Sequence, residues 1–263
     1  MHENIGVAIL LTTIAGLSTA VGGLIVFFVK ETNRKFLSLS LGFSAGVMIY
    51  VSFIDILTEA QHILQTDMGD KVGALAMAIA FFFGILIIYC IDLYIPESHP
   101  TNNIDIEDKT FEQKRLMRTG IFMAVALAIH NLPEGIITFV SALYDPKVAI
   151  PIAVAIAIHN IPEGITVSVP IYYATGNRFK ALVYSFLSGL TEPLGAIVGY
   201  LLLLPLLSDF VYGIVFAAVA GIMIYISFNT LLPVSREYGG HKLSMLGMFS
   251  GMAFMSFSLI LFM

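Results

Sequence analysis

The chain has 263 residues, of which 58% are hydrophobic and only 12% are charged, and its mean hydropathy is +0.90. Soluble domains carry about 25% charged residues, so this composition excludes a soluble enzyme, a nucleic-acid-binding protein and a disordered scaffold. A net charge of -5 offers no basic face for phosphates. The single cysteine, Cys90, excludes a disulfide framework or a thiolate metal cluster within the chain. What remains is a polytopic membrane protein.

Apolar runs long enough to cross a bilayer follow one another along almost the whole chain. A transmembrane helix needs about 20 mostly apolar residues, and continuous rather than alternating runs favour helices over strands. The sequence therefore predicts an all-α, single transmembrane domain over residues 1–263 with eight membrane-spanning helices. Their predicted ranges are 5–29, 36–57, 71–95, 119–143, 148–173, 179–204, 209–233 and 241–262.

The basic residues are distributed unevenly between the connections. Of the 13 Lys and Arg residues, only Lys71 and Lys147 lie outside the connections that follow spans one, three, five and seven. Because cytoplasmic loops carry the excess of Lys and Arg, we predict a multi-pass protein of the cell (inner) membrane with both termini outside the cytoplasm. The one long connection, residues 96–118, is predicted to be a solvated cytoplasmic loop.

Two short segments are close copies of each other. Residues 45–53 read AGVMIYVSF and residues 220–228 read AGIMIYISF, and the two differences exchange valine for isoleucine. The copies lie in spans two and seven, which cross in opposite directions. We interpret them as part of an inverted repeat of spans 1–3 and 6–8 around a central pair, spans 4 and 5. Transporters built on inverted repeats place their site near the midplane.

The central pair carries two nearly identical polar motifs within apolar sequence, His130-Asn-Leu-Pro-Glu-Gly135 and His159-Asn-Ile-Pro-Glu-Gly164. Ionisable groups at membrane depth are costly and normally face a partner, a cavity or an ion. His and Glu four residues apart share one helix face, and the short connection between these spans favours antiparallel neighbours. Two imidazoles, two carboxylates and two amide oxygens then converge, a donor set for zinc, iron, nickel or manganese. Pro133 and Pro162 are predicted to bend both helices at the motifs.

A third carboxylate, Glu192, precedes a proline within span 6. It predicts a second, oxygen-rich metal site beside the first, with two glutamates shared between them. The first site consists of His130, Glu134, His159 and Glu163; the second consists of Asn131, Glu134, Asn160, Glu163 and Glu192. Without a cation three carboxylates repel one another, so an empty site is expected to take up protons, and metal affinity is predicted to depend on pH.

Other polar residues lie toward the two ends of the pathway. The residues Asp55, Glu59 and His62, at the outer part of span 2, are predicted to form an entry relay that attracts cations. At the inner end of span 3, the predicted exit relay consists of Asp92, Glu97 and His99. For each relay the alternative of ordinary interfacial or loop residues stays open.

In these motifs the chain resembles the ZIP family of divalent metal transporters, and within it the bacterial ZupT-type branch. The resemblance implies uptake of Zn2+ into the cytoplasm, with Fe2+, Mn2+, Co2+ and Cd2+ as further cargo. It also implies a binuclear centre on the seven motif and span-6 residues given above, and an elevator-like movement of a transport bundle. Dimers occur in the family, and Gly195-x-x-x-Gly199 and Gly247-x-x-x-Gly251 supply small residues for close helix contacts.

The leading prediction is therefore a carrier of divalent transition metals, and not an enzyme. Its expected partners are the lipid bilayer and the metal ions, without nucleic acid and without a cofactor other than the transported metal. The sequence lacks a P-loop, so the chain itself is not expected to hydrolyse ATP. Two other functions stay open: a metal-selective ion channel, and an intramembrane metallo-hydrolase, for which no HExxH motif is present.

Overall fold

The computed structural model describes residues 4–30, 33–94, 109–144, 146–203 and 208–262. Within these ranges every regular element is helical and no strand occurs, which confirms the predicted all-α class. The helices are α1 (Ile5–Gly23), α2 (Arg34–Val51), α3 (Leu57–Met68), α4 (Asp70–Tyr94), α5 (Lys109–Tyr144), α6 (Pro146–Thr175), α7 (Arg178–Gly189), α8 (Thr191–Val198), α9 (Asp209–Ile226) and α10 (Leu232–Phe262).

Helix ends follow from local side-chain and backbone chemistry. Asn33, Asn177 and Ser208 cap α2, α7 and α9, because each side-chain oxygen accepts the backbone N–H three residues further on. Gly69 separates α3 from α4 and has a φ of 83°, and Gly240 has a φ of 75°. Side-chain-bearing residues rarely adopt such angles. The backbone at Gly240 is non-helical and divides α10 into two parts.

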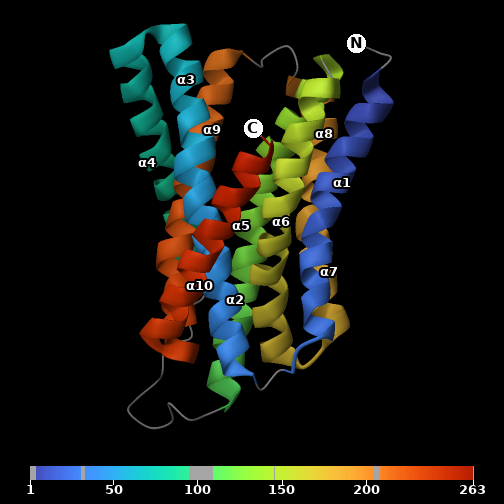
Figure 1. Cartoon of the computed structure of the whole chain (residues 1–263), viewed down its shortest axis with the longest axis vertical. Coiled ribbons are helices and arrows are strands. Elements are labelled where there is room, and N and C mark those ends of the chain that lie inside the picture. Colours follow the sequence, from blue (N-terminus) through green and yellow to red (C-terminus); the bar gives the residue numbers. More distant parts are fainter. Residues whose placement is uncertain (1–3, 31–32, 95–108, 145, 204–207, 263) are drawn as a thin grey trace.

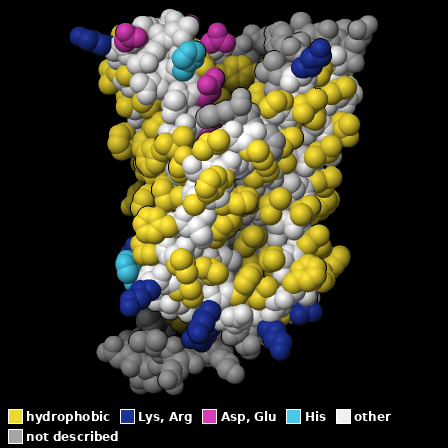
Figure 2. Space-filling model, in the orientation of Figure 1, with side chains coloured by type: hydrophobic (Ala, Val, Ile, Leu, Met, Phe, Trp, Pro, Cys, Tyr) yellow, Lys and Arg dark blue, Asp and Glu magenta, His cyan; other side chains and the backbone are white. Residues whose placement is uncertain are grey.

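Seven stretches of the described residues are long and apolar enough to cross a membrane. They are Ile5–Phe27, Arg34–Met68, Asp70–Tyr94, Thr110–Leu143, Ala149–Thr175, Arg178–Leu201 and Asp209–Leu261. Apolar side chains cover the middle of the visible surface, as expected for contact with lipid (Figure 2). The chain is therefore a multi-pass membrane protein. The first six stretches match the first six predicted spans, and the seventh combines the last two and contains the break at Gly240.

Two helices extend beyond the predicted spans. The second stretch continues to Met68 rather than ending at residue 57. Helix α5 begins at Lys109 rather than at residue 119, so the second half of the predicted loop 96–118 is helical. Glu97 and His99 of the predicted exit relay lie outside the described residues.

The helices pack in two groups that lie side by side (Figure 1). We call them the α5 group, which consists of α1, α5, α6, α7 and α8, and the α2 group, which consists of α2, α3, α4, α9 and α10. Within the α5 group, α1 and α5 both pack against α6, and α8 packs against α5; within the α2 group, α10 packs against α2, and α4 packs against α9.

Glycines hold each group together by close backbone approach. A Cβ on Gly22 of α1 would overlap the carbonyl of Ile161 in α6, and a Cβ on Gly84 of α4 would overlap that of Ala218 in α9. Every such glycine overlap that the structure describes lies inside one group and never between the two. The boundary between the groups therefore lacks the glycine-mediated backbone packing that joins helices inside each group.

The glycine pairs considered for a dimer are used inside the chain. Gly195 and Gly199 pack α8 and the turn after it against α5, and Gly247 and Gly251 pack α10 against α2. These two motifs therefore provide no support for the predicted homodimer, because their small faces are already covered.

Both copies of the repeated nine-residue sequence have the same local structure. Each α-helix is followed by five residues of π-helix, Ser52–Ile56 after α2 and Ser227–Leu231 after α9. In each copy the serine that begins this π-turn donates a hydrogen bond to the carbonyl four residues earlier. Such π-turns are rare and often occur at functional sites. The first carries Asp55 and the second carries Asn229.

Candidate metal centre

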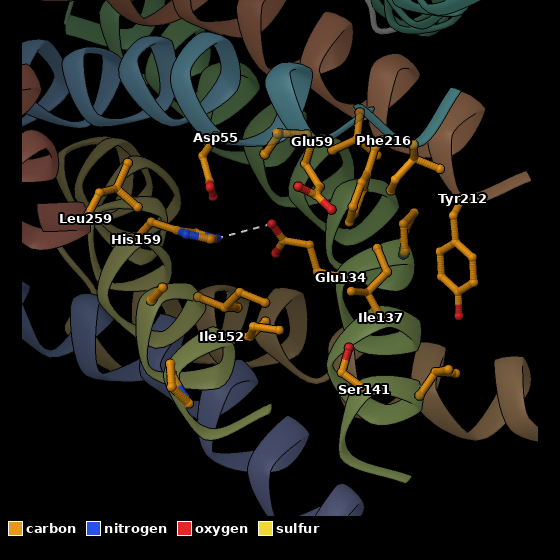
Figure 3. Close-up of a pocket in the computed structure, with 18 residues that line it drawn as sticks. Asp55, Glu59, Glu134, Ile137, Ser141, Ile152, His159, Tyr212, Phe216 and Leu259 are labelled. Carbon is orange, nitrogen blue, oxygen red and sulfur yellow. Dashed lines mark hydrogen bonds and ion pairs between the residues drawn. The ribbon is translucent and has the colours of Figure 1, made fainter. Parts of the chain in front are cut away.

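The two polar motifs meet where α5 and α6 pack against each other. His130 Nε2 lies 3.2 Å from an oxygen of Glu134, one helical turn away, and 3.2 Å from an oxygen of Glu163 on the neighbouring helix. His159 Nε2 lies 3.1 Å from the same Glu134 oxygen, and Figure 3 shows these two side chains pointing toward each other. The four residues are the predicted first site, and the structure brings all of them together.

This cluster has the spacing and the burial of a metal site. His130, His159 and Glu163 each offer a ligand atom within 4.8 Å of the others. The exposed fractions of His130 and Glu163 are 0%, and that of His159 is 3%. The helix pitch accounts for the pairing of His130 with Glu134 inside the first motif, and the packing of α5 on α6 accounts for the two pairings between the motifs.

The amide and carboxylate groups of the predicted second site lie on the side facing α1, α7 and α8. Asn160 Nδ2 donates to a Glu192 oxygen at 2.8 Å and to the Ala15 carbonyl at 3.0 Å. Asn131 Nδ2 donates to the Ser188 carbonyl at 3.3 Å. Gly135 lets the backbone of Glu192 approach α5 closely. The structure thus joins Glu192 to Asn160 directly, whereas Asn131 is bonded to the α7 backbone.

Most polar side chains of the centre keep at least one buried atom without a hydrogen bond. Buried polar groups in proteins are nearly always satisfied, and exceptions call for an explanation such as an ion. The atoms without a partner are Nδ1 of His130 and of His159, Oδ1 of Asn131 and Asn160, Oε2 of Glu134 and of Glu163, and Oε1 of Glu192. Apart from the ring nitrogens, whose role depends on the tautomer, these are acceptors, which suits a cation.

A cavity of about 570 Å³ leads to the centre along the boundary between the two helix groups. Glu134 and His159 line its inner part, and Asp55 and Glu59 lie on its α2-group side (Figure 3). Figure 2 shows acidic side chains gathered at the upper end of the molecule. Two predicted entry residues are therefore placed on a path to the centre. His62 is exposed on α3 and is not among the residues that line the cavity.

Three residues at the centre and cavity were not singled out from the sequence. Ser141 and Tyr212 line the cavity. Ser141 lies seven residues after Glu134 on the same face of α5, so helical periodicity would have found it. Ser44 of α2 donates a hydrogen bond of 2.9 Å to the carbonyl of Pro162 inside the second motif. No local sequence signal indicates that contact, because the two residues are far apart in the chain.

The remaining predicted exit residue, Asp92, is away from the centre and is fully engaged. One carboxylate oxygen accepts from Arg118 at 3.0 Å. The other accepts from the Tyr225 hydroxyl at 3.0 Å and from Asn229 Nδ2 at 3.1 Å. Asp92 thus joins α4 to α5 and α9 at the lower end of the molecule, and its role in an exit relay stays a prediction.

The fold and this centre define a multi-pass membrane protein with a buried candidate metal site at the end of a cavity. The sequence profile of the family described as ZIP Zinc transporter matches residues 96–259. The chain belongs to this family.

Relatives match over the full length. The chain is 56% identical to the Zinc transporter ZupT of Streptococcus mutans over 263 residues, which cover 100% of both chains. It is 56% identical to the Zinc transporter ZupT of Oceanobacillus iheyensis, over 98% of this chain and 99% of that one. It is 52% identical to that of Clostridium perfringens, over 99% and 97%. The family consists of transporters rather than enzymes, so the metallo-hydrolase alternative is not favoured.

Proposed function

We propose that this chain is a carrier that takes up zinc across the cell (inner) membrane. The observation that carries the proposal is the convergence of two histidines and two glutamates at the end of a cavity, with buried acceptor atoms that lack protein partners. Imidazole together with carboxylate oxygen is a borderline donor set that suits zinc. The names of the relatives, zinc transporters, support zinc as the metal.

The centre is proposed to hold two cations. Glu134 and Glu163 bridge them, with His130 and His159 on one side and Asn131, Asn160 and Glu192 on the other. Two dications offset three carboxylates, which would otherwise be buried without compensation. The bond from Asn160 to Glu192 supports this arrangement, because it holds the third carboxylate beside the second motif.

Eight crossings are proposed for the whole chain. A helix rises 1.5 Å per residue, so the 53 residues of Asp209–Leu261 would extend about 80 Å if straight, far beyond a hydrocarbon core of about 30 Å. The break at Gly240 divides this stretch into two crossings, and Figure 1 is consistent with α10 returning beside α2. With eight crossings and the excess of Lys and Arg at the lower end, both termini lie outside the cytoplasm.

Transport is proposed to proceed by movement of the α5 group against the α2 group. The two motifs and Glu192 all lie in the α5 group, so the centre travels as one unit. The glycine overlaps lie only within groups, which supports a boundary along which the groups slide. The five-residue π-turns that follow α2 and α9 begin at the corresponding serine of the two sequence copies, which supports the inverted repeat. A negative-inside potential of 100 mV contributes about 4.6 kcal/mol for a dication.

The test is uptake of radioactive zinc into proteoliposomes. Uptake should saturate with zinc concentration and fall to background in His130→Ala and Glu134→Gln. His241→Ala is the matched control, because His241 is exposed on α10, and its uptake should equal that of the unmodified chain. Flux that rises linearly with concentration would instead indicate a channel. Normal uptake by Glu134→Gln would contradict the proposal.

Competition and oligomer measurements address the remaining predictions. Unlabelled Fe2+, Mn2+, Co2+ and Cd2+ are expected to reduce zinc uptake, since a mixed set of imidazole and oxygen donors accepts several divalent ions. A homodimer is expected from the family resemblance alone and is tested by the mass of the protein in lipid nanodiscs.

A further inference from the structure

The lower end of α5 carries charged residues along one stripe. Glu112, Arg115 and Arg118 follow one another at intervals of three residues, which places them as neighbours on a helix surface. They lie in the part of α5 that extends beyond the predicted span. Each of them contacts a charged residue on a different helix of the α2 group.

Three ion pairs result, and all of them join the two groups. Glu112 accepts from Arg34 of α2 at 3.0 Å. Arg115 pairs with Glu237 of α10. Arg118 pairs with Asp92 of α4 at 3.0 Å.

Two further features reinforce this contact. Arg34 and Arg115 both lie over the ring of Tyr238, each with its guanidinium carbon 5.8 Å from the ring centroid, a geometry that is favourable for cation–π attraction. Asp92 is held in place by Tyr225 and Asn229 of the α2 group. Asn229 belongs to the π-turn after α9, the counterpart of the π-turn that carries Asp55 at the open cavity.

The two ends of the boundary between the groups therefore differ. At the upper end the boundary widens into the cavity that reaches Glu134 and His159. Elsewhere the two groups share one apolar core, whose fully buried side chains include Met48, Met123, Val167 and Met223. The ion pairs lie at the lower end.

We propose that Asp92–Arg118, Arg34–Glu112 and Arg115–Glu237 form an inner latch that keeps the cytoplasmic side of the metal path closed while the outer side is open. The latch must separate before the α5 group can expose the centre to the cytoplasm. This inference rests on the proposed function, because it assigns these six residues to one step of the transport cycle. Asp92 is then a gating residue instead of a ligand waiting on an open exit path.

The latch is tested by the accessibility of one reporter thiol. Cys90, which is exposed, is replaced by serine, and Ala126→Cys introduces the reporter. Ala126 is 0% exposed and lies eleven residues after Arg115 and seven before Pro133, on the face of α5 shared by both. The full chain in zinc-free lipid nanodiscs is treated with a membrane-impermeant maleimide, and the labelling rate is measured.

Arg118→Gln should raise this rate about tenfold, since a hydrogen bond to a charged group contributes enough free energy to shift an equilibrium by about that factor. Arg118→Lys, which keeps the charge, should raise it much less. Lys180 is exposed near the start of α7, at the same lower end of the molecule. Lys180→Gln removes its charge and should leave the labelling rate unchanged. Arg118→Gln labelling at the rate of Lys180→Gln would overturn the proposal.

Exchanging the two charges of one ion pair distinguishes loss of the latch from unfolding of the protein. Arg34→Glu alone should speed labelling, and the double variant Arg34→Glu with Glu112→Arg should return it to the starting rate. Equal rates in the single and double variants would refute the latch. Labelling is measured without zinc, so failure here with normal zinc uptake refutes the latch alone. A chain that fails to transport zinc refutes the proposed function whatever its labelling.

Discussion

The contact between Asn160 and Glu192 allows the proposed second metal site to be tested by a single-atom change. Asn160→Asp replaces the amide NH2 by an oxygen and alters the volume very little. In the metal-free protein it removes the donors to Glu192 and to the Ala15 carbonyl, and it places two carboxylates at the former hydrogen-bond distance. In the zinc-bound protein a charged carboxylate replaces the neutral amide as the ligand at this position.

The magnitude follows from the 2.8 Å separation of the two atoms. Two unit charges at that distance repel by about 6 kcal/mol at an effective dielectric constant of 20. The two lost hydrogen bonds add about 1 kcal/mol each. Uptake of a proton by the pair of carboxylates removes much of this repulsion, so we expect a destabilisation of about 2 to 3 kcal/mol and a fall in Tm of roughly 5 to 10 °C without metal.

The assay is thermal unfolding of the purified chain with and without zinc, followed by tyrosine fluorescence because the chain has no tryptophan. Zinc should raise the Tm of Asn160→Asp by more than it raises that of the unmodified chain, because the cation offsets the repulsion. Asn177→Asp is the matched control: the new aspartate can still cap α7 at an exposed position. A metal-free Tm of Asn160→Asp equal to that of Asn177→Asp would refute the reasoning.

Three further predictions concern packing, entry and pH. Gly135→Ala should lower the Tm by several degrees through overpacking, because its Cβ would overlap the carbonyl of Glu192. The control Gly6→Ala should leave the Tm unchanged, because a Cβ there meets no atom within 4 Å. Asp55→Asn with Glu59→Gln should raise the KM for zinc uptake and leave kcat nearly unchanged, since cavity charges raise the local cation concentration; a lower kcat at unchanged KM would contradict an entry role. Zinc affinity measured by calorimetry should fall from pH 7.5 to 5.5, because protons compete for the ligands, and an unchanged affinity would argue against the centre.

Much of the fold could be predicted because membrane helices are specified locally. Apolar runs of sufficient length predicted the first six spans to within a few residues at most ends. The start of α5 was misplaced for a physical reason: residues 109–118 are polar, so hydropathy alone assigns them to solvent. Their helical structure is accompanied by partners on α2, α4 and α10 that are distant in the chain.

In the candidate centre, too, some features follow from local sequence and others depend on contacts between distant residues. His130 and Glu134 are related by the helix pitch, and so are His159 and Glu163, so the helix face that each pair shares follows from spacing alone. The contacts of Asp92 with Arg118 and of Ser44 with Pro162 could not be predicted, because no spacing rule connects residues on separate helices. The Gly195 and Gly247 motifs were compatible with contacts inside or between chains, and only the packing distinguished them.

The sequence by itself therefore determined the membrane-spanning helical class and the two motif faces, because hydropathy and a period of 3.6 residues are properties of short segments. The tertiary structure decided which donors are neighbours, where the cavity lies and which charges join the two helix groups. Those outcomes depend on how closely separate helices approach, and that distance is set by glycine contacts and side-chain packing along the whole length of the bundle.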